Sequence, residues 1–356
     1  MKALSYQGPG RSSWGEAPDP VVLHPEDAVV RVALTSICAI DPDILGGGVP
    51  EVAAGRILGH EAVGTVTAIG PGVQRVALGD RVLVSCVCAC GRCAACRTLA
   101  YGRCTGGGGW LLGHLIDGTQ AEYVRTPFAD GSLHRLPRGV GDESALLLAD
   151  LLPTAFEVGV RSGGVGPGDT VLVVGAGPTG LAAIATARLY SPGRIIAVDR
   201  AEGRLAVAER IGADVVLPAD RVDAERVRAL SPDGFGADVA IETGDLPGDW
   251  ALGLCTRAVR PGGRVARVGP HGRVAPGYPD PDPRRPDELR AGHLTVTAGL
   301  VDTSSTPLLL GMLDAGRLDV AGLVTHRFAL DEIGRAYEVL AHAGGESGVL
   351  KVALAG

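Results

Sequence analysis

A glycine-rich turn restricts the folds open to this chain of 356 residues more than any other feature. An apolar run over 170–174 leads into the turn, and a helical pattern begins at Pro178. Glycines at this spacing let the backbone approach a pyrophosphate group, while the following helix supplies N–H donors and positive potential. We therefore predict a dinucleotide-binding unit rather than a turn without a ligand. Its contact residues would be Gly175, Gly177, Pro178, Thr179 and Gly180.

A carboxylate follows the next predicted strand at the spacing that dinucleotide sites use. The run over 194–198 ends at Asp199, about 20 residues after the turn. A carboxylate there accepts hydrogen bonds from the adenosine ribose hydroxyls, which favours NAD over NADP. Arg200 comes directly after it and could instead contact a 2′-phosphate. NAD is therefore the expected cofactor, and NADP stays open as the alternative.

The pattern of predicted secondary structure changes near Gly168. Before it, short β-like runs alternate with glycine and proline, at 28–34, 62–69, 81–85 and 121–126. After it, strand and helix patterns alternate, with strands at 170–174, 194–198, 237–241 and 264–268 and helices from Pro178 and Glu202. The first part predicts a β-rich, partly barrel-like domain, and the second predicts a doubly wound parallel sheet.

The C-terminal part predicts further elements after the proline-rich stretch 276–286: a strand at 294–300, a helix over 331–341 and a closing strand at 349–353. A chain of this length suggests two domains. We expect an α/β protein in which 1–152 and 293–356 form one domain and 153–292 form the dinucleotide-binding domain.

Composition argues against several classes of function. The net charge is −7, and basic residues form no cluster beyond scattered pairs such as Arg284-Arg285, so nucleic-acid binding is not expected. The most apolar window, 171–190, is interrupted by glycines, Pro178 and Arg188, which is wrong for a membrane span. The N-terminal residues carry no export signal, so we expect a cytoplasmic protein with reduced thiols that acts on a small molecule.

Four cysteines lie close together in the sequence, at Cys90, Cys93, Cys96 and Cys104. This spacing lets four thiolates converge tetrahedrally on one ion, and zinc is the natural occupant. Such a site has no open position, so its expected role is to hold a lobe over about 86–106 in place. A disulfide cluster is the alternative, which the compact spacing and the reducing compartment disfavour.

A second set of metal-ligand types is dispersed along the sequence. Cys38 follows an apolar run, His60 and Glu61 follow Gly59, and Asp150 follows the run 146–149. Thiolate, imidazole and carboxylate groups all bind zinc. Taken singly, each residue has a structural explanation: a packed thiol, a hydrogen-bonded core imidazole or a carboxylate at a helix end.

Three motifs together resemble those of one known family. They are Gly59-His60-Glu61-x2-Gly64-x5-Gly70, the four-cysteine lobe, and the glycine turn with Asp199. Over its whole length the chain resembles the zinc-dependent medium-chain dehydrogenase/reductases, the alcohol dehydrogenase family. Segments 109–114, 117–125, 149–150 and 299–303 resemble the branch of formaldehyde dehydrogenases and bacterial secondary alcohol dehydrogenases. The resemblance implies a GroES-like catalytic domain, a Rossmann domain, and a homo-tetramer or homo-dimer joined through the nucleotide domains.

The resemblance also implies roles for individual residues. Cys38, His60 and Asp150 would hold a catalytic zinc that acts as a Lewis acid, with Glu61 as an exchangeable ligand and Asp41 orienting His60. The four lobe cysteines would hold a structural zinc, which makes two ions per chain. Trp110 and His114 would line the substrate pocket.

The chain departs from this family at two positions. A serine or threonine usually stands two residues after the catalytic cysteine, often with a histidine three residues further on, but here these positions are Ile40 and Asp43. Ile40 cannot form a hydrogen bond, so the usual first step of proton transfer is absent. Asp43, the cofactor ribose, Thr154 or water would have to carry the proton, and Ile40 would shape the pocket.

The departure keeps other functions open. A reductase of iminium ions or conjugated carbonyls needs no proton on a metal-bound oxygen, and it is the main alternative to alcohol/carbonyl interconversion. A non-catalytic protein that binds zinc and nucleotide is the less favoured third possibility.

Overall fold

The computed structural model describes residues 1–244, 246, 248–268, 292–341 and 348–356. The chain forms two compact units. The first contains Met1–Pro153, Val301–Gly316 and Ala321–Gly356, and the second contains Thr154–Leu300 and Arg317–Val320. The proline-rich stretch 276–286, including Arg284-Arg285, lies outside the described residues. No helix in the described part of the chain is long and apolar enough to cross a membrane.

The first unit is built on a sheet that is antiparallel apart from one parallel pair. In the described residues its strand order is β14-β15-β3-β4-β5-β7, with β6 also paired to β3, and β14 is parallel to β15. A separate antiparallel pair joins β1 and β2. The strands are β1 Lys2–Tyr6, β2 Ser12–Glu16, β3 Ala28–Ile37, β4 Ala62–Ile69, β5 Arg81–Val84, β6 Tyr123–Thr126, β7 Leu133–Arg135, β14 Val324–Ala329 and β15 Lys351–Ala355.

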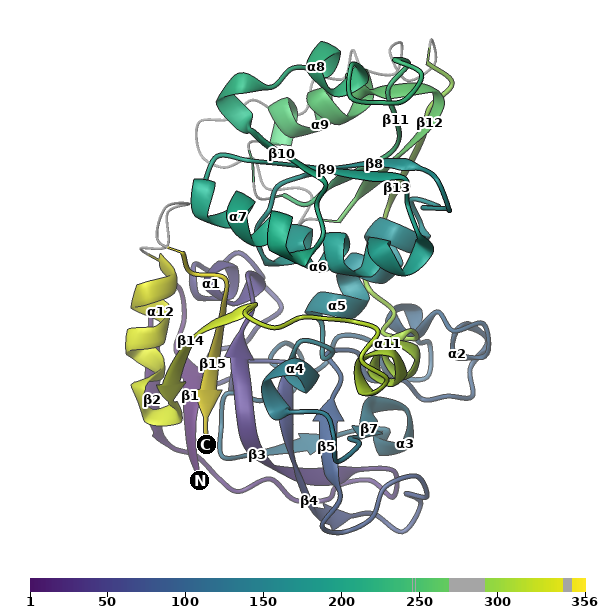
Figure 1. Ribbon diagram of the computed structural model, residues 1–356. Coiled ribbons are helices and arrows are strands. Elements are labelled where there is room, and N and C mark those ends of the chain that lie inside the picture. The colour runs from purple at the N-terminus through teal and green to yellow at the C-terminus, as the bar shows by residue number, and fades with distance from the viewer. Residues whose placement is uncertain (245, 247, 269–291, 342–347) are drawn as a thin grey trace. The chain divides into compact units, whose positions relative to one another are not determined.

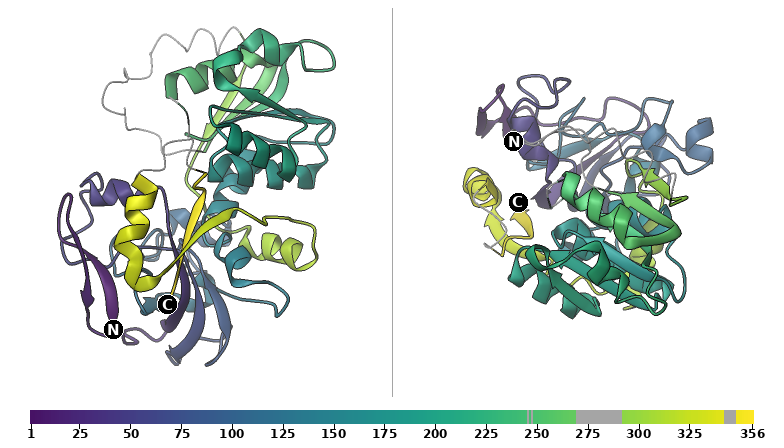
Figure 2. Two further views of the ribbon diagram at one scale, coloured as in Figure 1. Left: turned by 60° about the vertical axis from the view of Figure 1, so that its left-hand side comes forward. Right: turned by 90° about the horizontal axis from the view of Figure 1, so that it is seen from above.

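Short helices surround this sheet. They are α1 Ile40–Leu45, α2 Ala94–Arg97, α3 Ala129–Ser132, α4 Asp142–Leu146, α5 Leu151–Thr154, α11 Thr306–Asp314 and α12 Ile333–Ala341, with 3₁₀ turns at Tyr101–Arg103 and Leu330–Glu332. Helix α12 lies beside β14 and β15 (Figures 1 and 2). Its apolar face packs in one cluster with Ile37, Ile44 and Leu58, so the C-terminal segment shares a core with the region around α1.

The second unit contains a six-stranded parallel sheet in its described residues, with the order β10-β9-β8-β11-β12-β13. Helices α6 and α7 lie on one face of the sheet, and α8 and α9 lie on the other (Figure 1). Strand β8 is buried along its whole length, as expected for a central strand covered on both faces.

The elements of the second unit have these bounds: a π-helix at Ala155–Arg161, β8 Thr170–Val174, α6 Pro178–Ala187, β9 Arg194–Asp199, α7 Glu202–Ile211, β10 Val215–Pro218, α8 Ala224–Arg228, β11 Ala237–Glu242, α9 Gly248–Ala258, β12 Val259–Arg267 and β13 Thr295–Ala298, with 3₁₀ turns at Arg188–Tyr190 and Ala219–Arg221.

The predicted fold class is confirmed, but several predicted boundaries are wrong. Strand β3 continues to Ile37 instead of ending at 34, because its last residues pair with β15 and β4. Strand β12 begins at Val259 instead of 264, because Val259 pairs with Ala237 of β11. The predicted helix over 331–341 begins at Ile333 after a 3₁₀ turn. In the strands, pairing with a distant neighbour set the boundary, which local patterns do not report.

Candidate metal centres and cofactor turn

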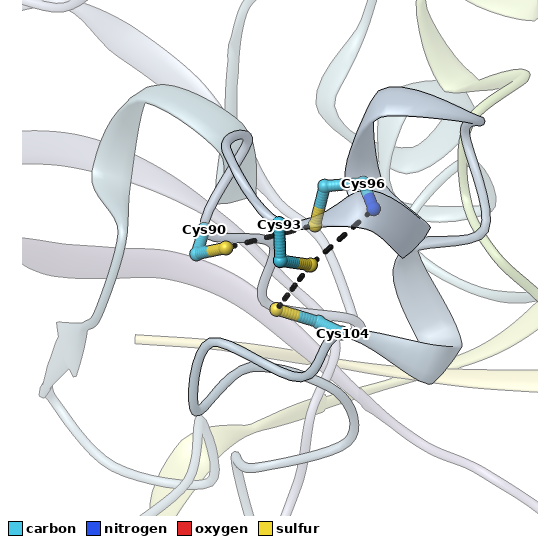
Figure 3. Close-up of side chains that lie close together, drawn as sticks. All are labelled: Cys90, Cys93, Cys96 and Cys104. Carbon is cyan, nitrogen blue, oxygen red and sulfur yellow. Dashed lines mark hydrogen bonds between the residues drawn. The ribbon is translucent and has the colours of Figure 1, made fainter.

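The four lobe cysteines converge in the structure, and their sulfur atoms all lie within 4.8 Å of one another (Figure 3). The Sγ atoms of Cys90 and Cys96 are 3.8 Å apart, and those of Cys93 and Cys104 are 3.9 Å apart. Four sulfurs around zinc at about 2.3 Å are about 3.8 Å from one another, so this arrangement fits zinc. All eight cysteines of the chain are free, and no disulfide competes with this assignment.

Local backbone features place these sulfurs. Cys93 caps helix α2, and its Sγ accepts a hydrogen bond from the Cys96 N–H at 3.4 Å. This N–H lowers the pKa of Cys93 to about 5, which favours a thiolate, whereas burial raises the pKa of Cys96 to about 12. A Cβ atom on Gly106 would lie 2.5 Å from the Cys90 Sγ, so only glycine lets the chain pass over that sulfur.

The dispersed ligand types also meet in one place. Ligand atoms of Cys38, His60, Glu61 and Asp150 all lie within 4.8 Å of one another. The Asp150 Oδ2 is 3.4 Å from the Cys38 Sγ and 3.6 Å from the His60 Nε2. The pairing of β3 with β4, with Thr35 opposite Ala62, brings the end of β3 next to the start of β4. Sheet register therefore joins Cys38 to His60 and Glu61.

A turn with a positive φ angle at Gly59 supports the second cluster. Gly59 has φ +88°, and a Cβ atom there would lie 2.7 Å from the side chains of Thr119 and Gln120. A residue with a side chain would be strained by its backbone angle and would collide with both neighbours. The glycine before His60 is thus required by the fold, and it lets Gln120 pack under the cluster.

Burial and the mutual contacts of these groups set their pKa values. Burial, followed by the Asp150 charge, raises the pKa of Cys38, so without a cation this thiol keeps its proton. Burial alone would lower the pKa of His60, but the interactions with Asp150 and Cys38 raise it well above its ordinary value. Zinc in place of these protons would be neutralised by one thiolate and one carboxylate, and the mixed sulfur, nitrogen and oxygen donor set is one that zinc accepts.

Asp41 lies behind His60. Its Oδ1 atom is 3.9 Å from the His60 Nδ1, and both atoms are buried without a hydrogen-bond partner among the described residues. Burial raises the pKa of Asp41, while the nearby His60 lowers it. A proton on Nδ1 facing this carboxylate leaves the Nε2 lone pair directed toward Asp150 and Cys38, as metal binding requires.

Lys351 belongs to the cluster, although the sequence analysis did not identify it. Its side chain is buried at the start of β15, and its Nζ lies 2.7 Å from Glu61 Oε2 and 2.9 Å from Oε1. Ser36 Oγ also donates a hydrogen bond to Glu61. Burial lowers the pKa of Lys351, but the charges of Glu61, Cys38 and Asp150 and the hydrogen bond to Glu61 together raise it above its ordinary value, so this lysine stays charged. The sequence does single out this residue in one way. It is one of only two lysines in the chain, and it interrupts an apolar run.

The predicted pocket residues lie close to these groups. The ring of Trp110 meets that of His60 edge to face at 6.0 Å and stacks on His114 at 4.3 Å. Ile40 begins helix α1 and is partly buried in the same apolar cluster as Trp110. Asp43 lies in the same helix and is partly exposed. An apolar side chain thus occupies the position where the family usually has a hydroxyl.

The glycine turn has the expected geometry. Gly175 has φ +101°, and a Cβ atom on Gly180 would lie 1.8 Å from the Gly175 carbonyl oxygen, so both positions require glycine. Helix α6 begins directly afterwards with Pro178 and Thr179. The hydroxyl of Thr243, a residue with no distinguishing signal in the sequence, lies 3.1 Å from the Val174 carbonyl oxygen and 3.3 Å from that of Gly175. It holds the turn against the end of β11.

Asp199 has a role within the turn that the sequence did not indicate. Its Oδ2 accepts a hydrogen bond from the Ala176 N–H at 2.7 Å, and its Oδ1 accepts one from the Ala201 N–H at 2.9 Å. The carboxylate is 2% exposed and lies 3.9 Å from the Arg204 guanidinium, whereas Arg200 is exposed. Asp199 therefore ties the glycine turn to the end of β9. Thr154 ends α5, at the start of the second unit.

Known proteins match both units. Residues 24–138 match the family described as the alcohol dehydrogenase GroES-like domain, and residues 178–283 match the one described as zinc-binding dehydrogenase. An alcohol dehydrogenase of Cupriavidus necator is 34% identical over 99% of this chain and 98% of its own length.

Solved structures match over the same extent. The apo form of zinc-dependent alcohol dehydrogenase 2 from Streptococcus pneumonia is 39% identical, with a TM-score of 0.89, and the match covers 99% of this chain and 98% of that one. An alcohol dehydrogenase from Escherichia coli CFT073, solved with NADH, is 25% identical, with a TM-score of 0.85 and coverage of 100% and 99%. Fold, motifs and full-length relatives agree, and the chain belongs to the zinc-type medium-chain alcohol dehydrogenase family.

Proposed function

We propose that this alcohol/carbonyl oxidoreductase binds two zinc ions per chain and transfers hydride between NAD(H) and a small alcohol or carbonyl substrate. The observation that carries the proposal is the convergence of Cys38, His60, Glu61 and Asp150, whose ligand atoms lie within 4.8 Å of one another. Three of these would bind the catalytic ion and leave a position for the substrate oxygen.

Each residue of the proposed centre has a separate task. Cys38 and Asp150 would supply the two negative charges, and His60 would supply a neutral nitrogen oriented by Asp41. Glu61 is held by Lys351 and Ser36, so as an exchangeable ligand it would have to break a buried ion pair before reaching the metal. When bound, zinc supplies Lewis-acid polarisation of the substrate oxygen.

The second unit would bind the nicotinamide cofactor, which accepts or delivers the hydride. The N–H groups at the start of α6 and the close approach allowed by Gly175, Gly177 and Gly180 suit a pyrophosphate. We propose NAD because Asp199 ends β9, where a carboxylate repels a 2′-phosphate. The exposed Arg200 is the feature that would favour NADP instead.

Proton transfer would follow an unusual route in this enzyme. Ile40 has no donor or acceptor, so the proton released by an alcohol would pass through water or through Asp43 of the same helix. This apolar position also favours a second candidate reaction, the reduction of an iminium ion or a conjugated carbonyl, in which hydride arrives without protonation of an oxygen at the metal.

Oligomeric state completes the proposal. Likeness to the family predicts a homo-dimer or a homo-tetramer, and sedimentation velocity distinguishes these from a monomer.

The first test is zinc per chain in protein purified without added metal or chelator. The proposal expects two ions in the wild type and one in both Cys38→Ser and Cys93→Ser. Alcohols with NAD⁺, and carbonyls, iminium ions and enones with NADH, then separate the two reactions. One zinc in the wild type, lost in Cys93→Ser but kept in Cys38→Ser, would reject the catalytic metal centre.

A further inference from the structure

A chain of buried hydrogen bonds runs from the C-terminal helix α12 toward the proposed metal ligand His60. The Tyr337 hydroxyl donates to Gln120 Oε1 at 2.9 Å, and Gln120 Nε2 donates to Asp41 Oδ2 at 3.0 Å. Asp41 Oδ1 faces the His60 Nδ1 at 3.9 Å. All four residues belong to the first unit, although they are far apart in the sequence.

The surroundings settle the orientation of the Gln120 amide. Its nitrogen lies near two acceptors, Asp41 Oδ2 at 3.0 Å and the Ser36 carbonyl oxygen at 3.3 Å. A flipped amide would point its oxygen at both acceptors and would repel them. The amide oxygen must therefore face Tyr337, whose hydroxyl is a donor that can satisfy it.

This orientation restricts the Asp41 carboxylate in turn. Its Oδ2 accepts from Gln120 and from the Cys38 backbone N–H, the latter at 2.9 Å. Its Oδ1 has no partner among the described residues, and neither has the His60 Nδ1 opposite. Buried polar atoms are rarely left unpaired, so these two atoms are the natural partners of each other. Two donors on one oxygen thus leave the other oxygen for His60.

The fold is shaped to hold Gln120 in this place. Its side chain is fully buried, its backbone N–H donates to the Leu58 carbonyl, and its carbonyl accepts from the Leu4 N–H. The absent side chain of Gly59 provides the space for its Cγ. Tyr337 is partly buried in the apolar cluster of α12. Buried polar chains of this kind orient metal ligands.

We propose that Gln120 and Tyr337 are positioning residues that set the orientation and tautomer of His60 through Asp41. The inference rests on the proposed function, because it takes the Cys38–His60–Asp150 cluster as a zinc site. The C-terminal helix would thereby contribute to metal affinity from a residue that touches neither metal nor substrate.

Zinc retention tests this inference without reference to turnover. Purified zinc-loaded protein is equilibrated against a series of EDTA concentrations, and zinc per chain is measured for the wild type and for Gln120→Met, Gln120→Glu and Tyr337→Phe. Gln120→Met keeps the volume and removes the donor, so the chelator midpoint for one zinc should fall about 10- to 100-fold. The chelator midpoint of Gln120→Glu should fall further, since a carboxylate at this position repels Asp41.

Tyr337→Phe removes one neutral hydrogen bond and should lower the same midpoint by about 2- to 10-fold. The control is Tyr6→Phe, a buried tyrosine of the same apolar cluster that lies outside the hydrogen-bond chain, and its midpoint should be unchanged. The lobe zinc is an internal control, because its midpoint should stay constant in all variants.

The outcomes separate this inference from the proposed function. Two zincs in every protein, with equal midpoints in the wild type and both Gln120 variants, overturn the inference alone. A parallel fall of the lobe zinc would show general destabilisation and would also overturn it. A wild type without zinc at the Cys38 cluster would overturn the proposed function and this inference together.

Discussion

The two metal clusters of this protein are built in opposite ways. The lobe takes all its ligands from one short segment, Cys90 to Cys104, and its sulfurs are placed by a helix cap within that segment and by Gly106 just after it. The Cys38 cluster takes its ligands from three separate segments, and Asp41, Gln120, Lys351 and Tyr337 hold these ligands from behind. The lobe needs only its own loop, whereas the Cys38 cluster needs the register of the whole sheet.

The comparison implies that the clusters fail differently when a ligand is lost. Cys38→Ser and Asp150→Asn should each lower kcat/KM by at least about a thousandfold, because several kcal/mol of charge stabilisation disappear and each 1.36 kcal/mol is about tenfold in rate. Circular dichroism and the melting temperature should stay close to wild type. Full activity in both variants would contradict a mechanism that depends on the metal.

The supporting residues of the Cys38 cluster should matter for stability. Lys351→Met leaves the Glu61 carboxylate buried without its partner, which should lower the free energy of unfolding by about 3–5 kcal/mol in urea titrations. The double variant Lys351→Met with Glu61→Gln should recover most of this loss, since no charge stays buried. A double variant as unstable as the single one would show that packing, and not charge, holds β15 there.

The pH dependence of the same ion pair has a definite sign. The pKa of Lys351 is raised above its ordinary 10.5, so its contribution to stability is fully present below pH 10.5 and is lost as pH rises through the higher folded value. The stability difference between wild type and Lys351→Met should therefore stay constant between about pH 7 and 10. A difference that shrinks within this range would contradict the raised pKa.

The lobe should respond in stability and yield. Cys93→Ser removes a sulfur from a four-thiolate site and should lower the free energy of unfolding by about 2–4 kcal/mol. The variant should also bind one zinc fewer per chain than the wild type. The turnover of the protein that remains folded should stay within a few-fold of wild type. Cys88→Ser is the matched control, because Cys88 is a buried thiol near the lobe but outside its cluster.

The cofactor turn extends the comparison to a site with both local and distant parts. Asp199→Ala should reduce kcat/KM for NAD about tenfold more than for NADP, because a ribose acceptor is removed. It should also lower stability slightly, since the Ala176 and Ala201 N–H groups lose their partner. Asp199→Asn keeps one of the two acceptor oxygens and should therefore recover only part of this loss of stability. An unchanged cofactor preference would refute the ribose assignment.

A substitution of Ile40 should have the smallest effect on activity. Ile40→Ser restores a hydroxyl at the start of α1 and should speed alcohol oxidation a few-fold, while iminium reduction stays constant or slows. Ile40→Val is the control, because it changes volume without adding a donor. Equal alcohol oxidation in the wild type and the serine variant would indicate that water already carries the proton.

Much of the architecture could be predicted because its signals are local. The turn glycines, the cysteine spacing and the strand–helix alternation each occupy one short window, and the structure shows them where they were expected. Strand ends were placed less well, as at Ile37 and Val259, because a strand ends where its partner ends.

The candidate catalytic site was predictable in its ligand types but not in its support. Gln120 and Tyr337 carry no distinguishing signal in the sequence. Lys351 stands out only as a charge within an apolar run, and nothing around these three residues points to residues 38, 41 or 61. Their meeting depends on β15 pairing with β3 and on α12 packing beside β14 and β15. The side-chain contacts themselves join residues that are 79 to 290 positions apart, which no local spacing encodes.

By itself, the sequence determined the lobe, the glycine turn and the class of the fold, because helix periodicity, cysteine spacing and glycine conformation act over a few residues. Only the tertiary structure decided which charge pairs with Glu61, which side chain holds Asp41, and which backbone N–H group binds Asp199 within the turn. The physical reason is that buried polar atoms must find partners, and which partners lie within reach is set by strand register and helix packing.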